Sequence, residues 1–165
     1  MAKKYSDTEI KDWFTKNVED AAGIRRNITR RYEKKVTYPV IGKMYFYVYD
    51  PKWKAKLPIY DKFPLVLPIE HYDNGFLGIN LHFLPQNSRA AILGKLMEFA
   101  NNDKLNKRTR LELSYKLLKN LSVAPALEPC LKRYLYSHVR SHIIEISANE
   151  WDRAIQLPVA DFVVK

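Results

Sequence analysis

The strongest sign of chemistry in this sequence is a short, densely positive stretch. Residues 25–35 carry six cations against one carboxylate, Glu33, for a formal charge of +5. Cations at this density repel one another, and a polyphosphate relieves that repulsion because each neutralised phosphate releases condensed counterions. The stretch therefore predicts a nucleic-acid-binding segment, with a generally basic surface as the alternative. Its cations are Arg25, Arg26, Arg30, Arg31, Lys34 and Lys35.

A second basic segment follows the Asp50-Pro51 turn and contains Lys52, Trp53, Lys54 and Lys56. Its lysines would neutralise phosphate charge, while the indole of Trp53 would cap an exposed duplex end. The alternative is a solvated loop with Trp53 folded back onto the core. We predict that this loop contributes to nucleic-acid binding.

Three tyrosines, Tyr45, Tyr47 and Tyr49, alternate with apolar residues and so share one face of an expected strand over 43–49. Tyrosine rings on a strand can stack on bases, each worth roughly 1–3 kcal/mol. The same face can instead form a protein interface or be covered by helices. The run also lacks the glycine-spaced pattern of a single-strand-binding sheet. Stacking and interface roles therefore both stay open.

A further group of cations is expected at the start of a helix, where the helix dipole disfavours positive charge. Such a placement is better tolerated when an anion lies nearby. The group comprises Lys104, Lys107, Arg108 and Arg110.

The sequence contains no complete set of residues for a known type of catalytic site. A metal-dependent nuclease needs clustered carboxylates with a lysine at short spacing; Asp61 and Glu70 have a loose spacing, but the lysine is missing. His138 and His142 lie four residues apart without a third ligand at a convincing distance. With five glycines, the chain also has no phosphate-cradling glycine loop. We predict a protein that is not an enzyme and has neither a metal site nor a cofactor.

The elements that position these residues follow from hydrophobic periodicity and turn signals. The 165 residues, 47 % of them apolar, are enough for one domain with its own core. Ser6 and Glu9 form a capping box for a first helix that ends at Gly23. The remaining pattern predicts strands at 43–49, 63–72, 76–83, 142–146 and 159–164, a hairpin turn at 73–75, helices from Ser88, over 111–121 and from Pro129, and a short helix capped by Ser147 and Glu150.

This order of elements predicts an α+β fold. We expect a small antiparallel β-sheet or a partly open barrel, SH3- or OB-like, with an N-terminal helix and a three-helix insertion before the last strands. Residues 1–41 would form the N-terminal helix and basic arm. Residues 42–165 would form a single α+β domain, with the insertion at about 86–141. Whether residues 24–41 are helix or arm stays open.

The single cysteine, Cys130, rules out an internal disulfide and suits a reducing cytoplasm. We expect it to be a buried structural thiol. The N-terminal residues lack the apolar core of a signal peptide, and no apolar run is long enough to cross a bilayer. These features favour a soluble, intracellular protein without membrane contact.

Several stretches together resemble one known family. They include Gly42-Lys43-Met44-Tyr45, Tyr49-Asp50-Pro51-Lys52, residues 57–65 and 75–85, Tyr134-Leu135, residues 137–141 and residues 151–158. This set, which covers about residues 40–160, resembles small virion proteins of T-even-type tailed bacteriophages described as DNA end protector or head-completion proteins.

The resemblance implies a virion structural protein, assembled in the host cytoplasm, that joins the filled head and stays near the terminus of the packaged genome. It would shield that end from host exonucleases after injection. Its partners would be DNA and other virion proteins of the head, neck or tail. Two alternatives stay open: a neck, tail or baseplate assembly protein that makes only protein contacts, and a single-strand or RNA-binding module.

Overall fold

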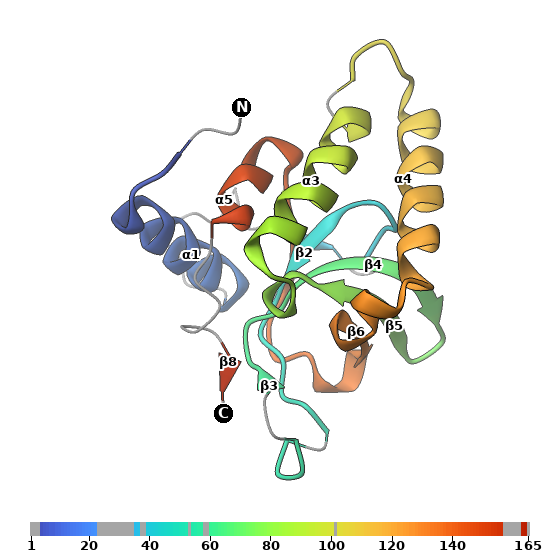
Figure 1. The fold of residues 1–165 in the computed structure, drawn as a ribbon. Helices are drawn as coiled ribbons and strands as arrows, with labels where there is room; N and C mark the ends of the chain where they lie inside the picture. Colours follow the sequence, from blue (N-terminus) through green and yellow to red (C-terminus); the bar gives the residue numbers. More distant parts are fainter. Residues whose placement is uncertain are drawn as a thin grey trace.

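The predicted α+β class is confirmed by the computed structural model of the chain, which describes residues 4–22, 35–36, 39–52, 54–57, 60–100, 102–156 and 163–164 (Figure 1). Its main sheet has six strands, all paired antiparallel. In spatial order they are β1 (Lys35–Val36), β7 (Ile143–Ile146), β2 (Met44–Phe46), β4 (Leu65–Tyr72), β5 (Gly75–Asn80) and β6 (Leu131–Leu135).

The described strands form an open sheet and not a closed barrel, with β1 at one edge and β6 at the other. A separate two-stranded sheet pairs β3 (Tyr60–Asp61) with β8 (Val163–Val164). Of the two predicted architectures, the small antiparallel sheet is therefore the one observed.

Strand alternation divides the core into two clusters, one on each face of the sheet. Met44 and Phe46 of β2 enter the larger cluster, while Tyr45 between them enters the smaller one. In β4, Leu65 and Leu67 likewise face the larger cluster and Val66 the smaller. Both faces of these strands are thus buried, which is why the first five positions of β4, residues 65–69, are all apolar.

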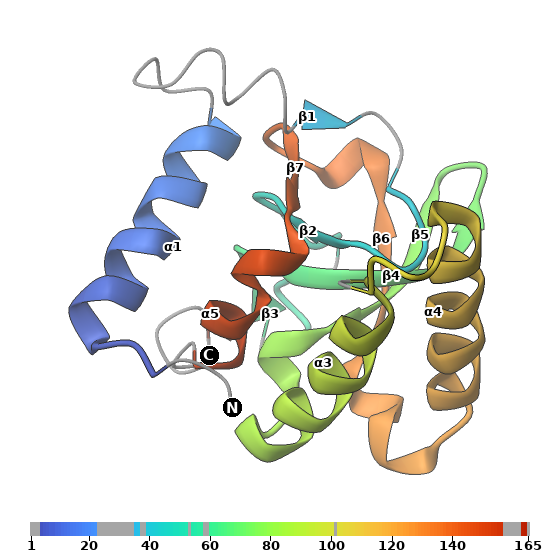
Figure 2. The ribbon, with the colours of Figure 1, turned by 90° about the horizontal axis from the view of Figure 1, so that it is seen from above.

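Four described α-helices accompany the sheet: α1 (Asp7–Ala22), α3 (Gln86–Ala100), α4 (Lys107–Ser122) and α5 (Trp151–Ile155). Residues from all four pack into the larger cluster, so the helices cover that face of the sheet (Figure 2). Arg89, buried in α3, donates to the carbonyl oxygen of Ala154 in α5 at 3.2 Å and fastens two of these helices together.

The start of α1 has the predicted capping box. The backbone N–H of Ser6 donates to Glu9 Oε2 at 2.8 Å, and the backbone N–H of Glu9 donates to Ser6 Oγ at 3.2 Å. Reciprocal bonds of this kind satisfy backbone donors that have no partner inside the helix. Ile10 and Trp13 then bury one side of α1 in the larger core cluster.

The predicted hairpin at residues 73–75 joins β4 to β5 and is confirmed. Pro68 lies inside β4, where the register shifts between Pro68 and Glu70. We predicted an edge or a bulged strand; β4 is bulged, but it lies between β2 and β5 and not at an edge. The irregularity accommodates a residue that has no backbone N–H to donate.

The predicted third helix of the insertion is wrong. Residues from Pro125 to Cys130 form a 3-10 segment, and Leu131–Leu135 is strand β6, paired along β5. The spacing of Leu131, Tyr134 and Leu135 fits a helix as well as a strand, and pairing with the distant β5 decided between them. The two long helices α3 and α4 are correctly predicted, although α3 begins at Gln86, two residues before the expected cap Ser88.

The second predicted capping box is also wrong. Ser147 precedes a 3-10 turn over Ala148–Glu150, and its side chain makes no capping bond. The Glu150 carboxylate instead accepts from the indole N–H of Trp13 at 3.3 Å. The Glu150 side chain, which the capping box would have used, therefore bonds to α1 instead.

Candidate nucleic-acid interface

The two predicted basic segments differ in how far the structure describes them. Arg25, Arg26, Arg30, Arg31, Lys34 and Trp53 lie outside the described residues. Lys35 belongs to β1 and pairs with Ile144 of β7, which places it at the edge of the sheet opposite β6. The described lysines of the second segment, Lys52, Lys54 and Lys56, are all exposed.

Asp50 connects this lysine loop, residues 50–57, to the segment that follows β6. Its Oδ1 accepts from Lys54 Nζ at 2.8 Å, and its Oδ2 lies 3.7 Å from a guanidinium nitrogen of Arg140. The hydrogen bond from Lys54 lowers the pKa of the Asp50 carboxyl. One carboxylate therefore holds two cations from distant parts of the chain at the same surface.

Strand β6 adds two cations beside this loop, each placed over an aromatic ring. The ammonium of Lys132 lies 4.5 Å from the centre of the Phe83 ring. The guanidinium of Arg133 lies 4.2 Å from the centre of the Tyr72 ring and donates to Asn74 Oδ1 at 2.9 Å. Cation–π contacts fix the direction of long side chains while leaving their charge at the surface.

A cavity of about 220 Å³ opens between the lysine loop and β6. Pro51 and Leu57 of the loop form one side, Lys132, Arg133 and Tyr134 of β6 another, and Asp61 with Asn80 contribute polar groups. Residues 131–142 contain three cations and no carboxylate. The surface around the cavity is therefore positively charged.

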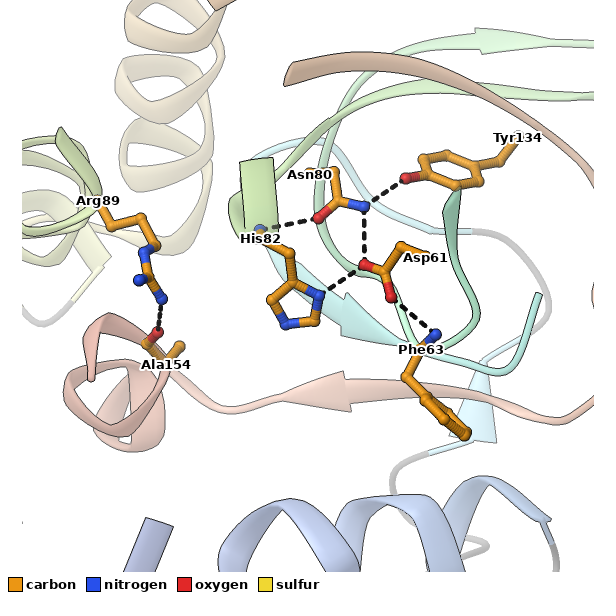
Figure 3. Close-up of polar contacts among 7 residues, drawn as sticks. All are labelled: Asp61, Phe63, Asn80, His82, Arg89, Tyr134 and Ala154. Atoms are coloured by element: carbon orange, nitrogen blue, oxygen red, sulfur yellow. Dashed lines mark hydrogen bonds and ion pairs between the residues drawn. The ribbon is translucent and has the colours of Figure 1, made fainter. Parts of the chain in front are cut away.

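A buried polar network joins three of the elements around this cavity (Figure 3). Asp61 Oδ1 accepts from the backbone N–H of Phe63 at 2.9 Å, and its Oδ2 accepts from Asn80 Nδ2 at 3.0 Å. The same Oδ2 lies 2.6 Å from His82 Nδ1. Asn80 Nδ2 also donates to the Tyr134 hydroxyl at 3.0 Å, which links β5 to β6. The network fixes β3, β5 and β6 relative to one another.

The tyrosines that were candidates for stacking or an interface are buried. Tyr45 and Tyr47 are 0 % exposed and Tyr49 is 6 % exposed. Tyr47 and Tyr49 pack edge-to-face with the ring of Tyr134. Burial raises the pKa of Tyr45 to about 12, and it raises the pKa of Tyr47 and Tyr49 as well. In this conformation Tyr45 and Tyr47 offer no ring face to a base.

The cations at the start of α4 lie elsewhere. Lys107 and Arg110 line a different cavity, of about 370 Å³, together with Lys43. Arg108 is paired with Glu112 at 3.0 Å within the helix. Figure 1 shows the start of α4 at the opposite end of the molecule from β3 and the lysine loop. The basic residues at the start of α4 and those of the lysine loop and β6 therefore form two separate surfaces, which the sequence alone did not show.

Sequence reasoning missed Lys132, Arg133 and Arg140 as site residues, because it assigned their region to a helix. The available signal was charge, since residues 131–142 carry three cations and no carboxylate. The expected burial of Cys130 is confirmed, since it is 2 % exposed and its thiol donates to the Phe83 carbonyl oxygen at 3.3 Å. Burial also raises the pKa of this thiol.

Among the residues that the structure describes, no group of three or more His, Cys, Asp or Glu side chains is placed to hold a metal ion. None of the helices described here combines the length and the apolar character needed to span a bilayer.

Fold and surface together define a small α+β protein with an open antiparallel sheet and a basic rim around a cavity at one sheet edge. A family model described as "Phage T4 terminal DNA protecting protein" matches residues 3–165. The chain belongs to this family, which confirms the resemblance found in the sequence. Comparison with curated proteins gave no match, and comparison with solved structures gave none either.

Proposed function

We propose that this protein is a non-enzymatic virion protein that binds the terminus of a packaged phage genome and shields it from exonucleases. The observation that carries the proposal is the family match over nearly the whole chain, since that family is named for protection of terminal DNA. Head completion, docking to other head, neck or tail proteins, and assembly in the host cytoplasm belong to the same proposal.

Two basic segments are the proposed contacts to phosphate. Arg25, Arg26, Arg30, Arg31, Lys34 and Lys35 supply one, and the lysine loop with Lys52, Trp53, Lys54 and Lys56 supplies the other. The exposure of the three loop lysines supports this assignment, as does the cavity that their loop forms with Lys132 and Arg133 of β6. Phosphate contacts carry no base-sequence information, so these segments would bind a DNA end of any sequence.

The test combines binding and protection. Linear and covalently closed circular duplexes of equal length are titrated with the protein across a salt series, and the linear duplex is then exposed to a processive exonuclease. We expect tighter binding to the linear form, a loss of roughly 10³-fold or more in affinity between about 50 and 200 mM salt, and slower digestion.

Equal affinity for linear and circular DNA would contradict end recognition. An absence of DNA binding even at low salt would favour the assembly protein that makes only protein contacts. The single-strand-binding alternative loses support from the burial of Tyr45 and Tyr47, and a preference for single strands in this assay would restore it.

A further inference from the structure

We propose that the cavity between the lysine loop and β6 binds a single unstacked nucleobase at the DNA terminus. This inference rests on the proposed function, because the base would belong to a DNA end held at the same surface. The cavity would contact the base of the terminal nucleotide. This contact is distinct from the attraction between the surface cations and the DNA phosphates.

The aromatic lining of the cavity suits a base. Tyr49, Tyr60 and Phe83 all contribute to its wall, and Tyr60 and Phe83 are partly exposed. Base–aromatic stacking tolerates any sequence, because every base has a π-face. A volume of about 220 Å³ lies below the roughly 300–1,000 Å³ typical of pockets for drug-sized ligands. The cavity therefore suits one base and not a base pair.

A buried hydrogen-bond donor lines the same cavity. Tyr134 is 4 % exposed, and its hydroxyl oxygen accepts from Asn80 Nδ2 at 3.0 Å. Within the described part of the chain, no hydrogen bond uses the hydroxyl proton of Tyr134. A hydroxyl is one donor as well as an acceptor, so this proton is available to a ligand. Burial raises the pKa of Tyr134 well above its usual value, which keeps the phenol protonated.

The distribution of charge favours a neutral group inside the cavity and a phosphate outside it. Asp61, which is 5 % exposed, is one of the residues that line the cavity, and an anion placed beside its carboxylate would be repelled. Lys132 and Arg133 belong to the same cavity, and Lys52 and Lys56 are exposed on the adjoining loop. A terminal nucleotide would thus insert its base into the cavity, while its phosphate binds the lysine and arginine side chains at the rim.

The test uses two linear duplexes that differ only in the last, unpaired nucleotide. In one duplex that nucleotide carries a base, and in the other it is abasic, so the number of phosphates is identical. We expect the duplex with the base to bind about 10-fold more tightly, as one stacked base and one hydrogen bond would provide. The abasic duplex should keep its salt-dependent affinity.

Three variants assign the effect to the cavity. Leu57→Trp places a large ring at the exposed rim (Leu57 is 43 % exposed) and should abolish the preference for the base without changing affinity for the abasic end. Tyr134→Phe removes the donor and should reduce the preference several-fold. Tyr47→Phe is the matched control, because its hydroxyl is buried without a hydrogen-bond partner among the described residues and it does not line the cavity.

The outcomes separate this proposal from the proposed function. If linear duplexes bind more tightly than circular ones but the base and abasic ends bind equally, the cavity proposal is overturned and end recognition stands. A preference for the base that survives Leu57→Trp also overturns it. If linear and circular DNA bind equally, the proposed function fails and the cavity proposal fails with it.

Discussion

Nδ1 of His82 lies 2.6 Å from Oδ2 of Asp61, and both side chains are buried. His82 follows the end of β5, whereas Asp61 ends β3, so the contact joins the main sheet to the two-stranded sheet. Because Asp61 also accepts from Phe63 and Asn80, one carboxylate organises the inner wall of the cavity. Removing it should therefore affect both stability and the site.

We expect Asp61→Ala to lower the free energy of unfolding by about 3–5 kcal/mol, since several buried donors lose their acceptor at once. Urea unfolding of the variant measures this loss. Asp12→Asn, which changes an exposed carboxylate on α1, is the control and should stay within about 0.5 kcal/mol. A loss below about 1 kcal/mol for Asp61→Ala would contradict the importance of the network.

The close approach of β5 to β6 depends on Gly75. A Cβ at this position would overlap the backbone carbonyl oxygen of Tyr134, so Gly75→Ala must push β6 away. We expect a destabilisation of about 1–3 kcal/mol and weaker preference for a terminal base, because β6 carries Lys132 and Tyr134. Thermal unfolding and the duplex assay measure the two effects.

Gly94→Ala is the matched control for that substitution. Gly94 lies in α3 with nothing within 4 Å of the added Cβ, and alanine is favoured over glycine in a helix by about 1 kcal/mol. This variant should be more stable than the parent protein and should bind DNA ends equally well. If Gly75→Ala and Gly94→Ala have the same stability and the same affinity for DNA ends, β5 and β6 can move apart without destabilising the protein.

Asp50→Asn tests whether DNA binds at the rim of the cavity beside β6 or at the start of α4. Asp50 pairs with Lys54 and lies near Arg140, so its neutralisation releases two cations at the rim of the cavity. We expect DNA affinity to rise several-fold at low salt and the salt slope to steepen by about 1. Equilibrium titrations at several salt concentrations provide both values.

Glu112→Gln is the corresponding change at the start of α4, where it releases Arg108. If DNA binds beside β6, this variant should leave the affinity and the salt slope unchanged. The opposite pattern, with an effect of Glu112→Gln and none of Asp50→Asn, would move the proposed interface to α4.

The buried tyrosines predict a loss of stability at alkaline pH. Burial raises the pKa of Tyr45 from 10.0 to about 12, and it also raises the pKa of Tyr47, Tyr49 and Tyr134. Between these two pH values the unfolded chain loses phenol protons that the folded chain retains, so folding is penalised as the pH rises. The stabilising contribution is complete below pH 10.0 and is lost as the pH approaches 12.

Phenolate absorbance and circular dichroism, followed together, measure this effect. We expect exposed tyrosines to ionise first and the buried ones to ionise only as the secondary structure is lost. Ionisation of all eleven tyrosines in one step near their usual pKa, with the fold intact, would contradict the burial of the cluster.

Local signals in the sequence were sufficient for the elements whose partners lie nearby. The capping box of Ser6 and Glu9, the turn at residues 73–75 and the alternation of Met44, Tyr45 and Phe46 all predicted what the structure shows. Caps and tight hairpins are decided by neighbouring residues, because the bonds that define them close within a few positions. The same reasoning failed at Ser147, where the Glu150 side chain bonds to Trp13 instead.

The sequence by itself determined the α+β class, the alternation of Met44, Tyr45 and Phe46 between the two faces of the sheet, and the family resemblance, since these depend on composition, periodicity and residue identity. The strand itself spans Met44–Phe46 and is shorter than the predicted 43–49. Only the tertiary structure decided that Leu131–Leu135 is a strand, that the tyrosine rings are buried and that the cations of β6 meet the lysine loop around one cavity. The physical reason is sequence separation: Asp50 and Arg140, like Asp61 and Tyr134, become neighbours only when antiparallel pairing brings distant segments together.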